Sequence, residues 1–279
     1  MAVYDINGQQ ITSVFGVDGQ SLTQAYDILG NELLEDQPVS DALTVMTYNV
    51  QWWSGLNSNV EMQETIIDRY SAQIIGLQEL RTAMGTVGQT VLADYPYQVL
   101  GVQTNKTGIV SEITLSDTQA GVFATQASET RGWQSAYFAF NGKRIFWLNA
   151  HLETSSNESV KVAQAKEVFD MVQGKEYFII TGDFNTVCKS VNDTEYTTIM
   201  KQFIDAGYHS ANCSQQHGFI DTWTSGSTLS GTWYPCDHII TSANIAIDSV
   251  TADTTKIEVA SETGQSIDHI PLIAEVTIS

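Results

Sequence analysis

The sequence predicts an α/β protein built mainly as one large domain, and three observations support that fold class. The chain has 279 residues, which suits one large domain or one domain with a small appendage. Hydrophobic residues make up 42% and aromatic residues 10% of the chain, which suits a packed core. Apolar runs of strand-forming residues and amphipathic segments with helical spacing both occur along it.

The predicted strands share one feature, because most of them end in a polar side chain. Residues 43–50 alternate between two faces and end near Asn49, and residues 72–79 end in Glu79. Residues 178–181 have strand-forming character and run directly into Gly-Asp-Phe-Asn, which fits a sharp exit from a buried strand. Further strands are expected over 97–102, 135–140, 143–148, 236–241 and 270–276.

Turns and helices separate these strands. The Asn141-Gly142 dipeptide predicts a tight hairpin between two of them. Helices are predicted over 57–70 and 157–173, and the second has an apolar face and a glycine, Gly174, at its end. Less regular segments are predicted as short helices over 86–95 and 194–206, a loop and an edge strand within 103–131, and a loop over 208–232.

An eleven-residue repeat precedes the large domain. Its three units begin at Tyr4, Phe15 and Tyr26, and each runs from an aromatic residue to a Gly turn. Asn-Gly and Asp-Gly dipeptides favour short strands joined by tight turns. Because such units bury little alone, we interpret 1–41 as a β-repeat arm and linker that packs on the main domain, 42–279, or on another chain. An attachment or oligomerisation module and a decorative extension both stay open.

The chain is strongly acidic, since 12 Lys and Arg against 32 Asp and Glu give a net charge of −20. This charge repels polyanions and disfavours tight, sequence-independent binding to nucleic acid. It does not exclude a phosphate-cleaving site, because a bound divalent cation reverses the local sign. The sequence has no apolar run of 18 residues and no visible signal peptide. We therefore expect no transmembrane segment and a cytoplasmic protein by default, or a secreted one if the sequence is truncated.

The three cysteines, Cys188, Cys213 and Cys236, form no Cys-x-x-Cys pair. Their odd number argues against a full disulfide framework. We interpret them as ordinary buried thiols, with one disulfide plus a free thiol as the alternative.

Eight polar side chains lie at or next to the ends of the predicted strands. They are Asn49, Glu79, His151, Asp183, Asn185, Asp237, Asp268 and His269. Oxygen ligands without cysteine indicate Mg²⁺, Mn²⁺ or Ca²⁺ rather than structural zinc. Histidines beside carboxylates suit proton transfer. Together these residue types favour phosphoester hydrolysis by a positioned water. Each residue alone also fits a turn, a solvated acid or a structural histidine.

Six motifs stand in the order found in the endonuclease/exonuclease/phosphatase superfamily, which the chain resembles over roughly residues 42–279. They are Thr47-Tyr48-Asn49-Val50, Gln78-Glu79, Asn149-Ala150-His151-Leu152, Gly182-Asp183-Phe184-Asn185, Asp237-His238-Ile239 and Asp268-His269-Ile270-Pro271. Members of this superfamily include deoxyribonuclease I, exonuclease III, neutral sphingomyelinases and inositol polyphosphate 5-phosphatases. The resemblance implies a four-layered α/β sandwich, with two mixed β-sheets flanked by helices.

The resemblance also implies roles for the residues on the metal and water side of the site. Glu79 is expected to bind the divalent metal, with Asn49 adjacent, and Asp268 is expected to belong to the same network. Asp183 is expected to orient and polarise the attacking water. Asn185 is expected to hold the phosphate.

On the phosphate side, the resemblance implies that His269 contacts the scissile phosphate and is oriented by Asp237. His151 is the second histidine expected to face the phosphate. Three softer matches are expected to contribute substrate-phosphate contacts: Arg81, Arg131 and Asn149.

The leading hypothesis is a phosphodiesterase or nuclease that depends on Mg²⁺ or Mn²⁺, with Ca²⁺ as a further option. DNA or RNA is the first expected substrate, because the two-histidine site and Arg81 resemble a nuclease. The net charge and Glu112, which follows a strand where many members have a basic residue, favour a small or lipid phosphoester instead. A third hypothesis is a catalytically silent binding protein anchored by the β repeat.

Overall fold

The computed structural model describes residues 3–4, 10–11, 42–50, 60–80, 90–101, 106–127, 129–154 and 157–279. The chain divides into two compact units, Met1–Asp41 and Ala42–Ser279. In the first unit, strands β1 (Val3–Tyr4) and β2 (Gln10–Ile11) pair in antiparallel fashion. The rest of the eleven-residue repeat, including its Asn-Gly and Asp-Gly dipeptides, lies outside the described residues.

In its described residues, the second unit contains two six-stranded mixed sheets and an antiparallel pair of short strands, β12 (Trp223–Thr224) and β13 (Trp233–Tyr234). The order in one sheet is β15 (Ile245–Ala252), β16 (Leu272–Ile278), β3 (Ala42–Asn49), β4 (Ile74–Gln78), β6 (Gly108–Ser111) and β5 (Tyr97–Leu100). The order in the other is β11 (His209–Ser210), β14 (Asp237–Thr241), β10 (Phe178–Asp183), β9 (Lys143–His151), β8 (Gly132–Phe140) and β7 (Ser116–Val122). The pairs β3/β4 and β9/β10 are parallel, and the other pairs within these sheets are antiparallel.

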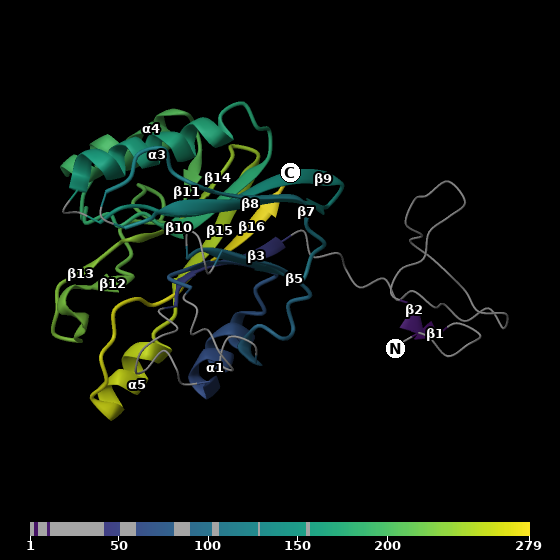
Figure 1. Cartoon of the computed structure of the whole chain (residues 1–279), viewed down its shortest axis with the longest axis horizontal. Helices are drawn as coiled ribbons and strands as arrows, with labels where there is room; N and C mark the ends of the chain where they lie inside the picture. The colour runs from purple at the N-terminus through teal and green to yellow at the C-terminus, as the bar shows by residue number, and fades with distance from the viewer. Residues whose placement is uncertain are drawn as a thin grey trace. The chain divides into compact units, whose positions relative to one another are not determined.

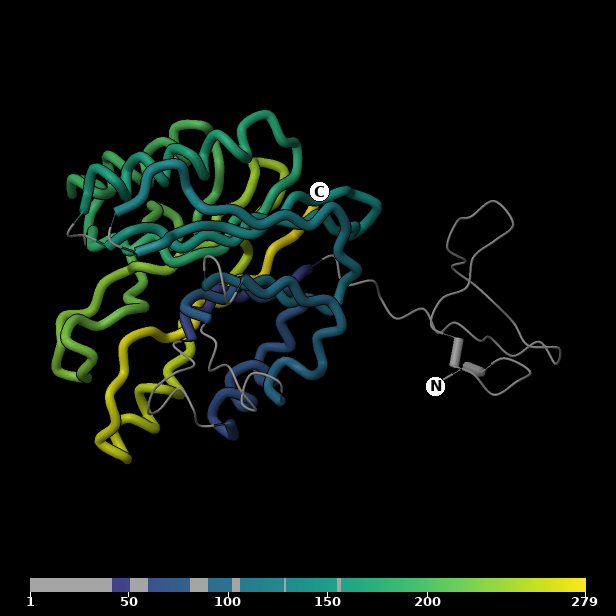
Figure 2. Tube along the Cα trace, in the orientation of Figure 1, coloured from purple at the N-terminus to yellow at the C-terminus, as the bar shows by residue number. Residues whose placement is uncertain are grey.

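Helices cover the outer face of each sheet, as Figures 1 and 2 show. Helices α1 (Val60–Tyr70) and α5 (Thr255–Thr263) pack with β3 and β4 around one apolar cluster. Helix α3 (Glu158–Val172), the π-helical turn η4 (Tyr196–Met200) and α4 (Lys201–Asp205) pack with β9 and β10 around another. The predicted four-layered sandwich is thus confirmed. None of the helices in the described parts of the chain is long and apolar enough to cross a membrane.

The alternation of side chains along the strands explains why a polar site forms at one end of the sandwich. In β9, Trp147 belongs to the apolar cluster between the sheets, and the next residues on its face are Asn149 and His151. In β10, Ile179 belongs to the same cluster, and Asp183 follows on that face. Because β9 and β10 run parallel, their polar ends coincide. The layer between the sheets is therefore apolar at one end and polar at the other.

The turn chemistry of the β8–β9 hairpin matches the prediction. Asn141 and Gly142 have φ values of 49° and 72°, the left-handed conformation that an Asn-Gly turn provides. The described residues of the segment 103–131, for which one edge strand is predicted, contain two strands. β7 lies at a sheet edge, whereas β6 lies inside its sheet between β4 and β5. Strand β15 and helix α5, near the C-terminus, have no counterpart in the sequence prediction.

Candidate active site

The carboxylate of Asp183, at the end of β10, lies at the centre of the polar site. Its Oδ2 accepts a 3.0 Å hydrogen bond from Asn49 Nδ2 on the opposite sheet. The same oxygen lies 3.4 Å from His151 Nε2 and 3.5 Å from His269 Nε2. Oδ1 accepts a 2.8 Å hydrogen bond from the backbone N–H of Asn185. Burial raises the pKa of Asp183 to about 6, with His269 acting in the opposite direction and Asp237 adding to the rise.

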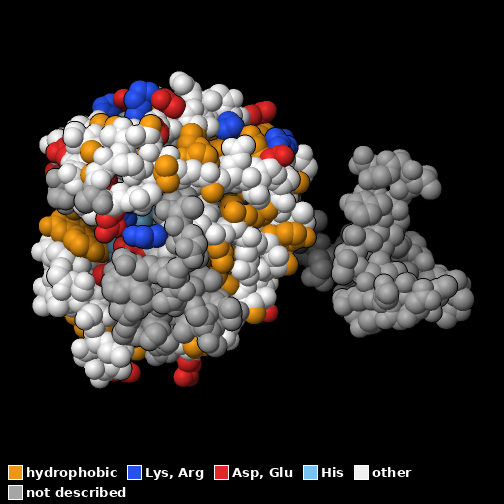
Figure 3. Space-filling view, in the orientation of Figure 1, with side chains coloured by type: hydrophobic (Ala, Val, Ile, Leu, Met, Phe, Trp, Pro, Cys, Tyr) orange, Lys and Arg blue, Asp and Glu red, His pale blue; other side chains and the backbone are white. Residues whose placement is uncertain are grey.

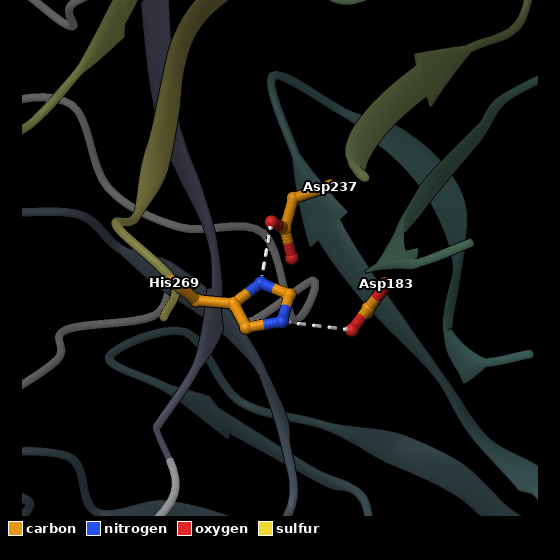
Figure 4. A group of neighbouring side chains, drawn as sticks. All are labelled: Asp183, Asp237 and His269. Carbon is orange, nitrogen blue, oxygen red and sulfur yellow. Dashed lines mark hydrogen bonds and ion pairs between the residues drawn. The ribbon is translucent and has the colours of Figure 1, made fainter. Parts of the chain in front are cut away.

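His269 bridges two carboxylates, as Figure 4 shows. Its Nδ1 lies 2.9 Å from Asp237 Oδ2, and its Nε2 faces Asp183. Burial by itself would lower the pKa of His269, but Asp237 and Asp183 outweigh it and raise the pKa to about 10. The imidazole is therefore positively charged at neutral pH and is oriented by Asp237.

His151 has the opposite character. Burial, followed by the positive charges of Arg131 and His269, lowers its pKa well below the ordinary value. The contact between His151 and Asp183 is therefore a contact of a neutral imidazole rather than an ion pair. Arg131 supplies the positive charge on this side, because its Nη1 lies 2.6 Å from His151 Nε2 and 2.9 Å from Nδ1. The buried Nε of Arg131 has no hydrogen-bond partner in the described part of the protein.

Several buried oxygen atoms at this end of the sandwich lack a partner, which fits a cation. Among the described residues, Asn49 Oδ1, Asp237 Oδ1 and Asp268 Oδ2 accept no hydrogen bond. Asp268 uses its other oxygen to accept a 2.6 Å bond from the backbone N–H of His269. The half-buried Glu79 follows β4 with a left-handed φ of 58°. Oxygen donors of this kind suit Mg²⁺, Mn²⁺ or Ca²⁺.

Another group that could hold a metal consists of Asp183, Asp237 and His269, whose ligand atoms lie within 4.8 Å of one another. In this structure the imidazole of His269 links the two carboxylates. Figure 3 shows a face on which basic, histidine and acidic atoms gather in one small area. The site therefore combines several carboxylates with a charged histidine and a buried arginine.

Asn149 lies between the sheets with its amide fully used inside the protein. Its Nδ2 donates to the carbonyls of Leu77, at 2.8 Å, and Gly108, at 2.9 Å. Its Oδ1 accepts from Gln78 Nε2 at 2.7 Å and from Thr181 Oγ1 at 3.1 Å. The side chain therefore joins the two sheets and supports the floor of the site. Strand alternation places Asn149 on the same face as His151.

Arg81, the remaining residue predicted to contact a substrate phosphate, lies outside the described residues.

Lys256, in the first turn of α5, is a buried residue near the site that sequence reasoning missed. Its Nζ has no hydrogen-bond partner among the described residues and lies 5.0 Å from the centre of the Tyr48 ring. Burial lowers its pKa to about 8, opposed by the charges of Asp268, Asp237 and Glu79. In the sequence, Lys256 stands in a segment with a weak apolar pattern, so nothing there predicts that its side chain is buried.

The three cysteines are free thiols and all are buried. The Sγ atoms of Cys188 and Cys213 lie 3.3 Å apart. Cys236 Sγ donates to the carbonyl of Thr186 at 3.1 Å. Cys188 and Cys213 belong to the apolar cluster that also contains Phe184, the residue between Asp183 and Asn185.

The fold is that of the superfamily that the sequence resembles. A sequence profile described as the Endonuclease/Exonuclease/phosphatase family matches residues 46–259. The chain therefore belongs to this family, and the resemblance drawn from the motifs is confirmed. No curated protein sequence was found to match it.

Solved structures with the same fold include TDP2 proteins and a bacterial member of the family. One is TDP2 of D. rerio in complex with a single-strand DNA product, with 18% identity, a TM-score of 0.68, and coverage of 84% of this chain and 98% of that one. TDP2 of C. elegans is 18% identical, with a TM-score of 0.63 and coverage of 85% and 75%. A family protein from Bacteroides vulgatus is 16% identical, with a TM-score of 0.66 and coverage of 85% and 99%.

Proposed function

We propose that the protein is a divalent-metal-dependent phosphodiesterase in which Asp183 activates the attacking water. One observation carries the proposal: Asp183 Oδ2 contacts nitrogen atoms of Asn49, His151 and His269 at one point between the two sheets. A carboxylate held by so many groups is fixed in position, and its pKa of about 6 leaves it able to accept a proton near neutral pH.

The two histidines have different roles on the phosphate side, because only His269 is positively charged. His269, charged and oriented by Asp237, donates a hydrogen bond to a phosphoryl oxygen and stabilises the negative charge that develops there. His151 stays neutral, so Arg131 provides the second positive charge. The free Nε–H of Arg131 suits a further hydrogen bond to a phosphate oxygen.

Asn185 completes the phosphate pocket. Its Nδ2 donates to the carbonyl of Leu152 at 3.0 Å, which fixes the direction of the amide. On the other side of Asp183, the carboxylates of Glu79 and Asp268 and the amide oxygen of Asn49 would hold the divalent cation. When bound, this cation neutralises charge on the phosphate and lowers the pKa of water.

We propose a nucleic acid strand as the first substrate class. The family includes nucleases, and the D. rerio neighbour is described in complex with a single-strand DNA product. The net charge of −20 opposes long polyanions, so a short strand or a strand end suits this protein better than a long duplex. A small or lipid phosphoester is the second candidate, favoured by the same charge.

The test compares bis-p-nitrophenyl phosphate with a short labelled single-stranded DNA and with plasmid DNA. Each is incubated with Mg²⁺, Mn²⁺ or EDTA, and an Asp183→Ala variant serves as the control. Metal-dependent cleavage of DNA that requires Asp183 would support the nuclease proposal. Turnover of the small diester alone would keep the reaction and move the substrate to small or lipid phosphoesters. Equal turnover by wild type and Asp183→Ala would contradict the proposal.

A further inference from the structure

A buried ion pair in the outer helical layer contacts the active-site loop from behind. Lys161 of α3 is fully buried, and its Nζ donates to Glu195 Oε1 at 2.7 Å. The same Nζ donates to the backbone carbonyl of Asn185 at 2.8 Å. Glu195, at the start of η4, uses its second oxygen to accept from the backbone N–H of Val187 at 2.6 Å. The pair thus holds the residues on both sides of Thr186.

The backbone of Asn185 is held on both sides. Its φ of 51° lies in the left-handed region, which asparagine adopts more readily than most residues but which still needs a fixed surrounding. Towards the site, its backbone N–H and side-chain amide are bound to Asp183 and to the carbonyl of Leu152. Away from the site, Lys161 is the partner of its carbonyl among the described residues. Lys161 therefore contacts the residue that we propose to hold the phosphate.

Stability alone is a weak reason for this arrangement. Removing a lysine and a carboxylate from water has a large desolvation cost, and well-packed apolar residues often replace such a pair without loss. The ion pair fixes the geometry of the loop instead, because each partner also makes one hydrogen bond to the loop backbone. Other contacts tie the loop to a different element: Thr186 Oγ1 donates to the carbonyl of Pro235, and Cys236 Sγ donates to the carbonyl of Thr186.

We infer that Lys161 and Glu195 are positioning residues, which fix the backbone of Asn185 so that its side chain meets a phosphoryl oxygen. This inference rests on the proposed function, since Asn185 is expected to hold the phosphate there. Neither residue touches substrate. Both act through the loop, as rigid supports for a group whose placement matters to within about 1 Å.

The experiment uses the full chain carrying Lys161→Met together with Glu195→Gln. The double variant leaves no unpaired buried charge, and the glutamine oxygen can still accept from Val187. The matched control is Lys166→Met with Asp170→Asn, which alters an exposed pair on the same helix, with 2.6 Å between Nζ and Oδ2. Both variants keep the net charge unchanged.

We expect kcat/KM for bis-p-nitrophenyl phosphate to fall by about 10- to 100-fold in the Lys161/Glu195 variant and by less than about 2-fold in the control. Both should keep a Tm near that of the wild type. When Asn185→Ala is added to the Lys161/Glu195 variant, the loss in kcat/KM should be smaller than the product of the two separate losses, because the effects of groups that act through one another are not additive in free energy. Unchanged kcat/KM in an active protein, or losses that multiply fully with Asn185→Ala, would overturn the inference.

Hydrogen exchange separates this inference from the proposed function. Peptides covering 183–188 should exchange faster in the Lys161/Glu195 variant than in wild type and control, whether or not the protein cleaves a given substrate. Unchanged exchange of this loop would overturn the inference without affecting the proposed hydrolysis. A wild-type protein that cleaves no phosphoester would instead contradict the proposed function.

Discussion

Asn49 and Asp183 are 134 positions apart in the chain, and Asn49 Nδ2 donates a 3.0 Å hydrogen bond to Asp183 Oδ2. Asn49 ends β3 in one sheet, and Asp183 ends β10 in the other. Both side chains are buried. This bond joins the unpartnered oxygen atoms of the site to its two histidines, so residues from both sheets meet at one buried polar site.

Replacing Asp183 by Asn tests the proposal that Asp183 accepts a proton from the attacking water. The variant keeps the size of the side chain but cannot accept a proton, so we expect hydrolysis of bis-p-nitrophenyl phosphate to fall by about 100- to 10,000-fold. The rate under saturating Mn²⁺ measures the effect, and circular dichroism confirms the fold. Asp170→Asn, an exposed change on α3, is the control and should leave the rate unaltered. A fall of less than about 3-fold for Asp183→Asn would mean that another group activates the water.

The dependence of activity on pH follows from two pKa values. Asp183, with a pKa of about 6, must be ionised to act as a base, so kcat/KM should rise as pH increases through about 6. His269, with a pKa of about 10, must stay protonated, so kcat/KM should fall as pH increases through about 10. A pH–rate profile of the small diester measures both limbs. In His269→Gln the fall in kcat/KM near pH 10 should disappear. If the fall persists in this variant, a group other than His269 causes it.

His269 should also link stability to pH. Its pKa is raised in the folded protein from an ordinary value of 6.5 to about 10. The charged histidine therefore contributes stability that is fully present below about pH 6.5 and is lost as pH rises towards 10. Urea unfolding at pH 6.5 and pH 9.5 should show a smaller difference for His269→Gln than for wild type. Equal differences in the two proteins would show that other groups control this dependence.

Asn149 should matter for stability. Asn149→Ala removes an amide that has four buried partners, and each buried group left unpaired costs about 1–3 kcal/mol. We expect the free energy of unfolding in urea to fall by about 3 kcal/mol or more. The control Asn244→Ala removes an exposed 3.3 Å bond to the carbonyl of Glu176 and should cost less than about 0.5 kcal/mol. Similar values for both variants would contradict the bridging role.

Lys256 should weaken cation binding. Its buried ammonium acts electrostatically on Asp268, Asp237 and Glu79, so Lys256→Met should raise the affinity for Mn²⁺ by about 10-fold. Calorimetric titration of the protein with Mn²⁺ measures this directly. Lys201→Met, an exposed change on α4, controls for the loss of one positive charge. An unchanged or weaker affinity in Lys256→Met would place the cation away from these carboxylates.

Much of the fold could be predicted because local patterns agree with it. Apolar alternation located β3, continuous apolar runs located β4 and β10, and the Asn141-Gly142 turn located the β8–β9 hairpin. The segments that escaped prediction have weaker patterns. β6 lies in a polar stretch, and α5 mixes threonine and charged residues, so pairing and packing with distant elements decide their structure.

The sequence alone determined which polar side chains follow the apolar runs, because each run ends where its apolar residues stop. These strand-end positions, together with the order of the family motifs, predicted that Asp183 and His151 share a site. Only the tertiary structure decided how these groups differ. His269 is charged because Asp237, at 2.9 Å, and Asp183 outweigh the effect of burial on its pKa, whereas burial and the charges of Arg131 and His269 lower the pKa of His151 and keep it neutral. Electrostatic energy depends on distance and burial in space, which the order of residues does not specify.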